Sequence, residues 1–130
     1  MRFHDRPVAI PLTLVALAAC LSAAGCGKGS SGAAQALSPE QVVPTIETAF
    51  KQAAPETKEA ANDVVAAIQS QDDPRALAQL QVLSTQPNLT PEQLSATARS
   101  TISMLARLQI AAANGNKAAE EVLRKYRATK

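Results

Sequence analysis

Residues 88 to 116 read NLTPEQLSATARSTISMLARLQIAAANGN, and this stretch decides the fold class of the chain. Its beginning carries a helix start, because Thr90 and Gln93 have the spacing of a capping box and Pro91 takes the first helical position, where its missing N–H is harmless. The end of the stretch has a signal for helix termination, since Gly115 suits the left-handed conformation that follows many helices. We therefore expect one long helix between these two signals.

The helix expected at residues 91 to 113 has apolar residues at helical spacing, which predicts one buried stripe. Leu89, just before the capping box, is placed to pack back on Leu94 as a hydrophobic staple. Met104 and Ile110 lie off the stripe, so more than one neighbour can pack on this helix. The members of the expected stripe are Leu94, Ala98, Ile102, Leu105, Leu108 and Ala112.

A shorter helix is expected at residues 39 to about 53. Ser38 and Gln41 form a second capping box at its start. Its end is set by Pro55, because a proline disfavours helical geometry in the residue before it. The sequence therefore repeats, near the start of the domain, the same helix-start signal that opens the long helix.

Further helices are expected on both sides of the long one. One spans residues 55 to 70, and the next has Asp73 as its cap and Pro74 at its first position. Asn116 can cap a last helix after the turn at Gly115. The faces expected to be buried on these helices are Ala61, Val64, Val65, Ile68, Leu77, Leu80, Leu83, Ala119, Val122, Leu123 and Tyr126.

Composition agrees with a helical domain. Aromatic residues make up only 2% of the chain, so packing depends on Ala, Leu, Val and Ile, which favours closely packed helices over strands. No segment shows strand alternation, and short connections should make neighbouring helices antiparallel. We predict an all-α fold, a small bundle of four to five antiparallel helices. The net charge of +2 gives no electrostatic footprint for nucleic acid, so no nucleic-acid partner is expected.

The N-terminal part of the chain has a different character. Residues 8 to 26 read VAIPLTLVALAACLSAAGC, an apolar run with Arg2 and Arg6 before it and the polar run GKGSSG after it. This layout is typical of a secretory signal peptide. Because the run ends on a cysteine, it resembles the signal peptide of a bacterial lipoprotein, whose lipobox consists of an apolar residue, two small residues and the cysteine that receives the lipid.

Two cysteines fit such a lipobox. The sequence LAAC at residues 17–20 has the favoured leucine, whereas AAGC at residues 23–26 has the favoured glycine before the cysteine. We prefer Cys26 as the lipidated residue, with Cys20 as the alternative, because cleavage at Cys20 would leave Cys26 as a spare thiol in an oxidising compartment. An uncleaved membrane anchor and ordinary secretion without lipid stay open as alternatives.

The resemblance implies a mature protein held at a membrane through an N-terminal lipid. It divides the chain into a signal peptide at residues 1–26, a flexible tether at residues 27–37 and a helical domain at residues 38–130. Gly27 is not the aspartate that retains such lipoproteins at the inner membrane. The resemblance therefore implies a lipid-anchored protein of the cell envelope, at the outer membrane and facing the periplasm if the host is Gram-negative.

The expected domain carries few residues that perform chemistry. The one histidine, His4, and both cysteines lie in the N-terminal segment, which removes Ser-His-Asp and Cys-His catalysis and the usual zinc ligand sets from the rest of the chain. Close carboxylates at helix starts suit caps and the helix dipole better than a catalytic cleft. We expect no enzyme activity, no cofactor and no metal site. The carboxylate pairs in question are Glu56 with Glu59, Asp72 with Asp73, and Glu120 with Glu121.

Two functions are compatible with this sequence. The first is a non-catalytic interaction or structural module, tethered to the membrane and bound to another envelope protein. Its contact surface would use the off-stripe residues Met104 and Ile110 and the basic end of the chain at Arg124, Lys125 and Arg127. The alternative is a carrier that holds a small apolar ligand between its helices, because Ala-rich faces can leave a groove where larger side chains would fill it.

Overall fold

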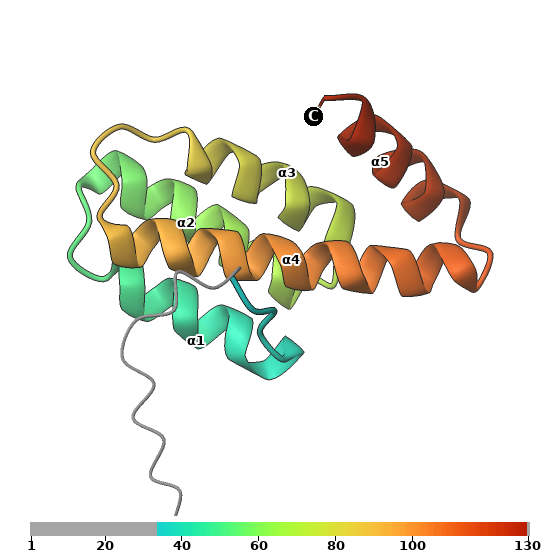
Figure 1. The fold of residues 1–130 in the computed structure, drawn as a ribbon. Helices are drawn as coiled ribbons and strands as arrows, with labels where there is room; N and C mark the ends of the chain where they lie inside the picture. The colour runs from blue at the N-terminus through green and yellow to red at the C-terminus, as the bar shows by residue number, and fades with distance from the viewer. Residues whose placement is uncertain (1–33, 130) are drawn as a thin grey trace, which may run out of the picture. The chain divides into compact units, whose positions relative to one another are not determined.

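The computed structural model describes residues 34 to 129, which form five helices and contain no strand (Figure 1). Successive helices run in alternating directions, so the prediction of a small all-α bundle is confirmed. α4 is the longest helix, and its second half extends past α1 and α3 towards α5. The five helices are α1 (Pro39–Phe50), α2 (Pro55–Gln69), α3 (Asp73–Ser84), α4 (Pro91–Ala113) and α5 (Lys117–Ala128).

The start of α4 has the predicted capping box. The Gln93 N–H donates to Thr90 Oγ1 at 3.2 Å, and the Thr90 N–H donates to Gln93 Oε1 at 3.0 Å. After the other end of α4, Gly115 has a φ of 87°, the left-handed conformation that the turn requires. Asn116 Oδ1 then accepts from the Ala119 N–H at 3.1 Å and caps α5, as predicted. These caps fix where α4 and α5 begin.

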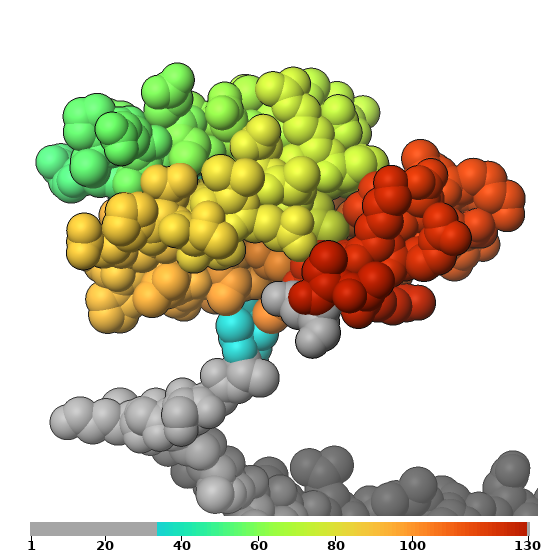
Figure 2. Space-filling view, turned by 90° about the horizontal axis from the view of Figure 1, so that it is seen from above, coloured from blue at the N-terminus to red at the C-terminus, as the bar shows by residue number. Residues whose placement is uncertain are grey.

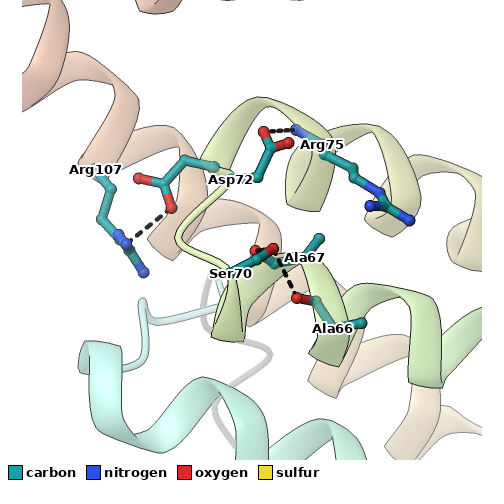
Figure 3. A network of polar contacts seen from close by, with 7 residues as sticks. Ala66, Ala67, Ser70, Asp72, Arg75 and Arg107 are labelled. Carbon is teal, nitrogen blue, oxygen red and sulfur yellow. Dashed lines mark hydrogen bonds and ion pairs between the residues drawn. The ribbon is translucent and has the colours of Figure 1, made fainter.

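The cap of α3 is Asp72, and the predicted cap Asp73 is wrong. The Arg75 N–H donates to Asp72 Oδ1 at 3.0 Å (Figure 3). Asp73 already lies in the first turn of the helix. The Asp73 carboxylate instead pairs with Arg107 of α4, with 2.8 Å between Oδ1 and Nη2. Either of two consecutive aspartates can cap a helix, and Asp72 is the cap here because its carboxylate accepts from the N–H three residues later, that of Arg75.

α1 is shorter than expected. It ends at Phe50, one turn before residue 53. Residues 51 to 53 form a turn in which the Ala53 N–H donates to the Phe50 carbonyl at 3.1 Å. The chain then becomes extended at Ala54, with a φ of −57° and a ψ of 151°, as expected for the residue before Pro55.

The core lies where α1, α2, α3 and one side of α4 meet, and α5 adds Ala119 and Leu123 to it. The faces predicted to be buried on α2 and α3 are buried, so periodicity gave the correct orientation for these helices. The largest fully buried side chains are Phe50, Ile46, Leu80, Leu83, Met104, Leu108, Val42, Val64 and Ser100.

The folded domain begins before residue 38. Leu37, which was expected at the end of the flexible tether, is buried in the core. Ser103 Oγ of α4 accepts from the Leu37 N–H at 2.7 Å and donates to the Leu37 carbonyl at 2.7 Å. Arg99 Nε donates to the Gln35 carbonyl at 3.1 Å. An apolar side chain and three hydrogen bonds therefore hold residues 35 to 37 on α4.

The buried stripe predicted for α4 is wrong for most of its length. Of the six expected members, only Leu108 is buried, whereas Leu94 is 48% exposed and Ile102 is 37% exposed. The side of α4 that faces its neighbours carries small and hydroxyl side chains, which let the helix approach α1 and α3 closely. The buried residues of α4 are Gln93, Ala96, Thr97, Ser100, Ser103, Met104 and Leu108.

Candidate interaction groove

The apolar residues that α4 does not bury line a groove, which we call the α4 groove. It has a volume of about 470 Å³ and opens to solvent. Its lining residues come from α3, α4 and α5, which Figure 2 shows in yellow, orange and red on one face of the molecule. α4 supplies most of its lining residues, α3 supplies two and α5 supplies Tyr126. The lining residues are Gln81, Ser84, Leu94, Thr97, Ala98, Thr101, Ile102, Leu105 and Tyr126.

Leu94 and Ile102 are large apolar side chains that the fold leaves accessible in this groove. They are 48% and 37% exposed, while on the opposite side of the same helix Ser100 is 0% exposed. The Ser100 hydroxyl makes no hydrogen bond with any other group in residues 34–129. α4 thus buries an unpaired hydroxyl and exposes two aliphatic side chains, the reverse of what hydration favours.

The α4 groove contains no charged side chain. Its polar members are the amide of Gln81 and the hydroxyls of Ser84, Thr97, Thr101 and Tyr126. At least three of these hydroxyls are already engaged: Ser84 Oγ donates to the Gln81 carbonyl at 2.7 Å, Thr97 Oγ1 to the Gln93 carbonyl at 2.8 Å, and Thr101 Oγ1 to the Thr97 carbonyl at 2.9 Å. The groove therefore suits an apolar occupant better than an ionic one.

A second groove, the α1–α4 groove, has a more polar lining and a volume of about 520 Å³. Thr45 and Thr48 of α1 face Glu92, Ser95 and Arg99 of α4 across it. The Arg99 guanidinium also holds the backbone of Gln35 through its Nε. This groove borders residues 35–37, so its polar side chains partly serve to fix the start of the domain.

Of the two α4 residues predicted to form a contact surface, the structure buries one and exposes the other. Met104 is 0% exposed and belongs to the core, so the expectation that it forms part of a contact surface is wrong. It was taken as off-stripe because the stripe itself was placed on the wrong side of α4. Ile110 is 64% exposed, on the second half of α4. It does not line the α4 groove.

The basic end of α5 is exposed but partly neutralised by its own helix. The Lys125 ammonium lies 2.8 Å from Glu121 Oε1, and the Lys117 ammonium lies 3.1 Å from Glu120 Oε2. The hydrogen bond from Lys125, and then its charge, hold the pKa of the Glu121 carboxyl below its usual value. Arg124 and Arg127 are exposed on the same helix. These pairs reduce the positive potential that the sequence alone suggested for an anionic partner.

Most carboxylates of the three pairs make caps or ion pairs within the fold. Asp72 caps α3, as Figure 3 shows. Asp73 pairs with Arg107. Glu56 is an exposed residue in the first turn of α2, where a negative charge suits the helix dipole. Within residues 34–129, no three Asp, Glu, His or Cys side chains come together as a metal ion would need.

The two candidate lipidation residues, Cys26 and Cys20, lie outside the described residues, so both remain predictions. Among residues 34–129, none of the helices combines the length and the apolar character that crossing a membrane requires. In comparisons with protein-family models, with curated proteins and with solved structures, nothing matches this chain.

The sequence singled out the apolar residues of the α4 groove but predicted the wrong role for them. Leu94, Ala98, Ile102 and Leu105 were all expected in the core, and they line an open groove instead. The walls from α3, at Gln81 and Ser84, carried no signal of their own. A second stripe of small residues on α4, at Ala96, Thr97, Ser100 and Ser103, was the available hint that another side of the helix was suited to burial.

Proposed function

We propose that this protein is a membrane-anchored lipoprotein of the bacterial cell envelope, and that its helical domain is a non-catalytic interaction module that docks a partner in the α4 groove. The placement of side chains on α4 is the observation that carries the docking surface: Leu94 and Ile102 are accessible while Ser100 is fully buried. The membrane anchor depends on the resemblance of residues 1–26 to a lipoprotein signal peptide.

The energetic argument concerns the exposed aliphatic side chains. Full burial of a Leu or Ile side chain contributes roughly 1.5–3 kcal/mol, and α4 forgoes part of this at Leu94 and at Ile102. Both residues line the same uncharged groove. A partner that covers this groove would recover that free energy, and adjacent accessible apolar groups are a common mark of a contact site.

The anchor is tested on the full-length chain expressed in a bacterium. The chain should enter the detergent phase of a detergent partition, and mass spectrometry of its N-terminal peptide should find an acylated cysteine at position 26. Cys26→Ser should abolish acylation, whereas the matched Cys20→Ser should leave it intact. A mature protein that begins at Met1 and stays in the aqueous phase would refute the anchor.

The docking surface is tested by a photo-crosslinking amino acid at position 98, an exposed position that lines the groove. The matched control carries the same amino acid at position 63, which is exposed on α2. In intact cells we expect a discrete crosslinked product from position 98 and none from position 63. Equal labelling from both positions, or no product from either, would contradict a docking role for the groove.

The alternative function, a carrier of a small apolar ligand, is favoured by one observation. The α4 groove has a volume of about 470 Å³ and a largely apolar lining, within the range of small-molecule sites. The core, in contrast, is occupied by fully buried side chains such as Ile46, Leu80 and Met104. Native mass spectrometry of the purified protein should then find a bound small molecule that Ala98→Trp displaces, and an unliganded protein would reject the carrier.

A further inference from the structure

We infer that the α4 groove is occupied by a second copy of this chain, in a twofold dimer whose two α4 helices cross antiparallel beside Ala98. This inference rests on the docking role proposed above for the groove, and it names the partner. Two features of the groove lead to it: the pattern of side chains around Ala98 and the absence of charge.

The side-chain pattern around Ala98 is symmetric. In a twofold contact, residue i of one copy meets residue j of the other and the reverse. Leu94 and Ile102 each lie four residues from Ala98, so in an antiparallel crossing at Ala98 each Leu94 faces the Ile102 of the other copy. The small Ala98 side chain, itself exposed, allows close approach at the crossing point. Both half-exposed aliphatic side chains of each copy are thereby covered.

The charges of α4 are compatible with this self-contact. A surface that meets its own copy brings like charges together if it is charged, which is costly. The α4 groove has no charged lining residue. In the antiparallel register, positions 104, 97 and 89 stand at the same height as Glu92, Arg99 and Arg107, and all three are uncharged; Met104 and Thr97 are buried within their own copy. No charged residue of α4 falls opposite another.

A contact through the α4 groove covers one flank of α4. Thr101 lines the α4 groove, whereas Ser95 lines the α1–α4 groove on the other flank and stays outside the contact. A contact through one helix is smaller than a standard interface, so we expect a weak dimer that attachment to one membrane would favour by raising the local concentration.

The register is tested by single cysteines in the full-length chain in intact cells under mild oxidation. Ala98→Cys should give a disulfide-linked homodimer, because the residue nearest the twofold axis meets itself. Leu94→Cys alone should not, because the two Leu94 residues lie about 12 Å apart along the helices by the helix rise, beyond disulfide reach. Leu94→Cys and Ile102→Cys on two differently tagged copies should link to each other. Asp63→Cys is the matched control for background oxidation, including that of Cys20 and Cys26.

The affinity is tested by sedimentation velocity of the purified full-length protein in detergent. The unsubstituted chain should form dimers as concentration rises, and Ala98→Glu should raise the dissociation constant at least about tenfold, because it places two carboxylates at the axis. Gln69→Glu, on the exposed end of α2, should leave it unchanged, and far-UV circular dichroism verifies that both variants fold. A chain that remains monomeric, or dimers that Ala98→Glu leaves intact, would overturn this inference.

The two proposals fail in different ways. If the photo-crosslinker at position 98 captures only a different protein and Ala98→Cys gives no homodimer, the groove docks another partner and the dimer is rejected, while the docking role stands. If position 98 gives no product of either kind, both are rejected. A homodimer linked through Leu94→Cys alone would reject the antiparallel register.

Discussion

α4 and α5 distribute their side chains in opposite ways. α5 buries Ala119 and Leu123, half-buries Val122 and Tyr126, and exposes its charged residues, so its predicted apolar face points to the right side. α4 buries Ser100 and exposes Leu94 and Ile102. The difference follows from the number of neighbours, because α5 packs mainly on one helix whereas α4 packs on three. A helix with several neighbours is oriented by close approach as well as by its apolar face, and the face left over is where a partner can bind.

The largest expected effect separates the two sides of α4. Met104→Ala removes a side chain that is 0% exposed and should destabilise the fold by about 2–5 kcal/mol. Leu94→Ala, a truncation of similar size at a side chain that is 48% exposed, should lower the free energy of unfolding by about 1 kcal/mol or less. Denaturant unfolding of the two variants measures both values. Equal losses would mean that Leu94 is buried in solution.

The next effect concerns the hydroxyl that holds the start of the domain. Ser103→Ala removes the oxygen that bonds both the N–H and the carbonyl of Leu37, each at 2.7 Å, and leaves two backbone groups unpaired. We expect a loss of about 1–3 kcal/mol in the free energy of unfolding. Ser95→Ala, an exposed serine of the same helix, is the matched control and should be neutral or slightly stabilising. Hydrogen exchange at the Leu37 amide should accelerate only in Ser103→Ala.

A neighbouring serine should respond with the opposite sign. The Ser100 hydroxyl is fully buried and has no hydrogen-bond partner among the described residues, so its burial is uncompensated. Ser100→Ala should stabilise the fold by on the order of 1 kcal/mol, more than Ser95→Ala, because it also removes this desolvation penalty. Thermal unfolding of the two variants measures the difference. A loss of stability in Ser100→Ala would show that its hydroxyl contributes a bond in the native protein.

The sequence predicted local features of this fold well and the orientation of α4 poorly. Capping boxes depend on residues three positions apart, so Thr90 and Gln93 placed the start of α4 without any knowledge of its neighbours. The buried side of α4 depends on helices distant in sequence, which periodicity within one helix does not encode. Leu37 was within reach of sequence reasoning, because an apolar residue before a cap is the first half of a hydrophobic staple, and Val42 stands at the second.

The α4 groove was only half predictable for the same reason. Leu94 and Ile102 stood out as apolar residues at helical spacing, but exposure is a property of the assembled bundle. The groove also needs Gln81 and Ser84 of α3 and Tyr126 of α5, which approach α4 only after folding. Asp72 and Asp73 show that even a local feature can be ambiguous in sequence. Both aspartates can cap a helix, and only the structure shows that Asp72 is the one that accepts from the Arg75 N–H.

The smallest effects are expected from pH and salt, and they separate an apolar contact from an ionic one. The pKa of the Glu121 carboxyl is held below its usual value by the hydrogen bond from Lys125, and that of Glu40 by its backbone N–H and by Ser38. A carboxyl whose pKa is lower in the folded state than in the unfolded state stabilises the fold at any pH above its unfolded-state pKa. This stabilisation is lost as the pH falls through the folded-state pKa. Stability followed by circular dichroism should therefore be flat from pH 8 down to about 5 and should decline at more acidic pH.

No Asp, Glu, Lys, Arg or His lines the α4 groove, so self-association should keep its strength across the same range and as salt is raised. A dimer that dissociates with added salt near neutral pH would place the contact on the charged surface of α5 instead.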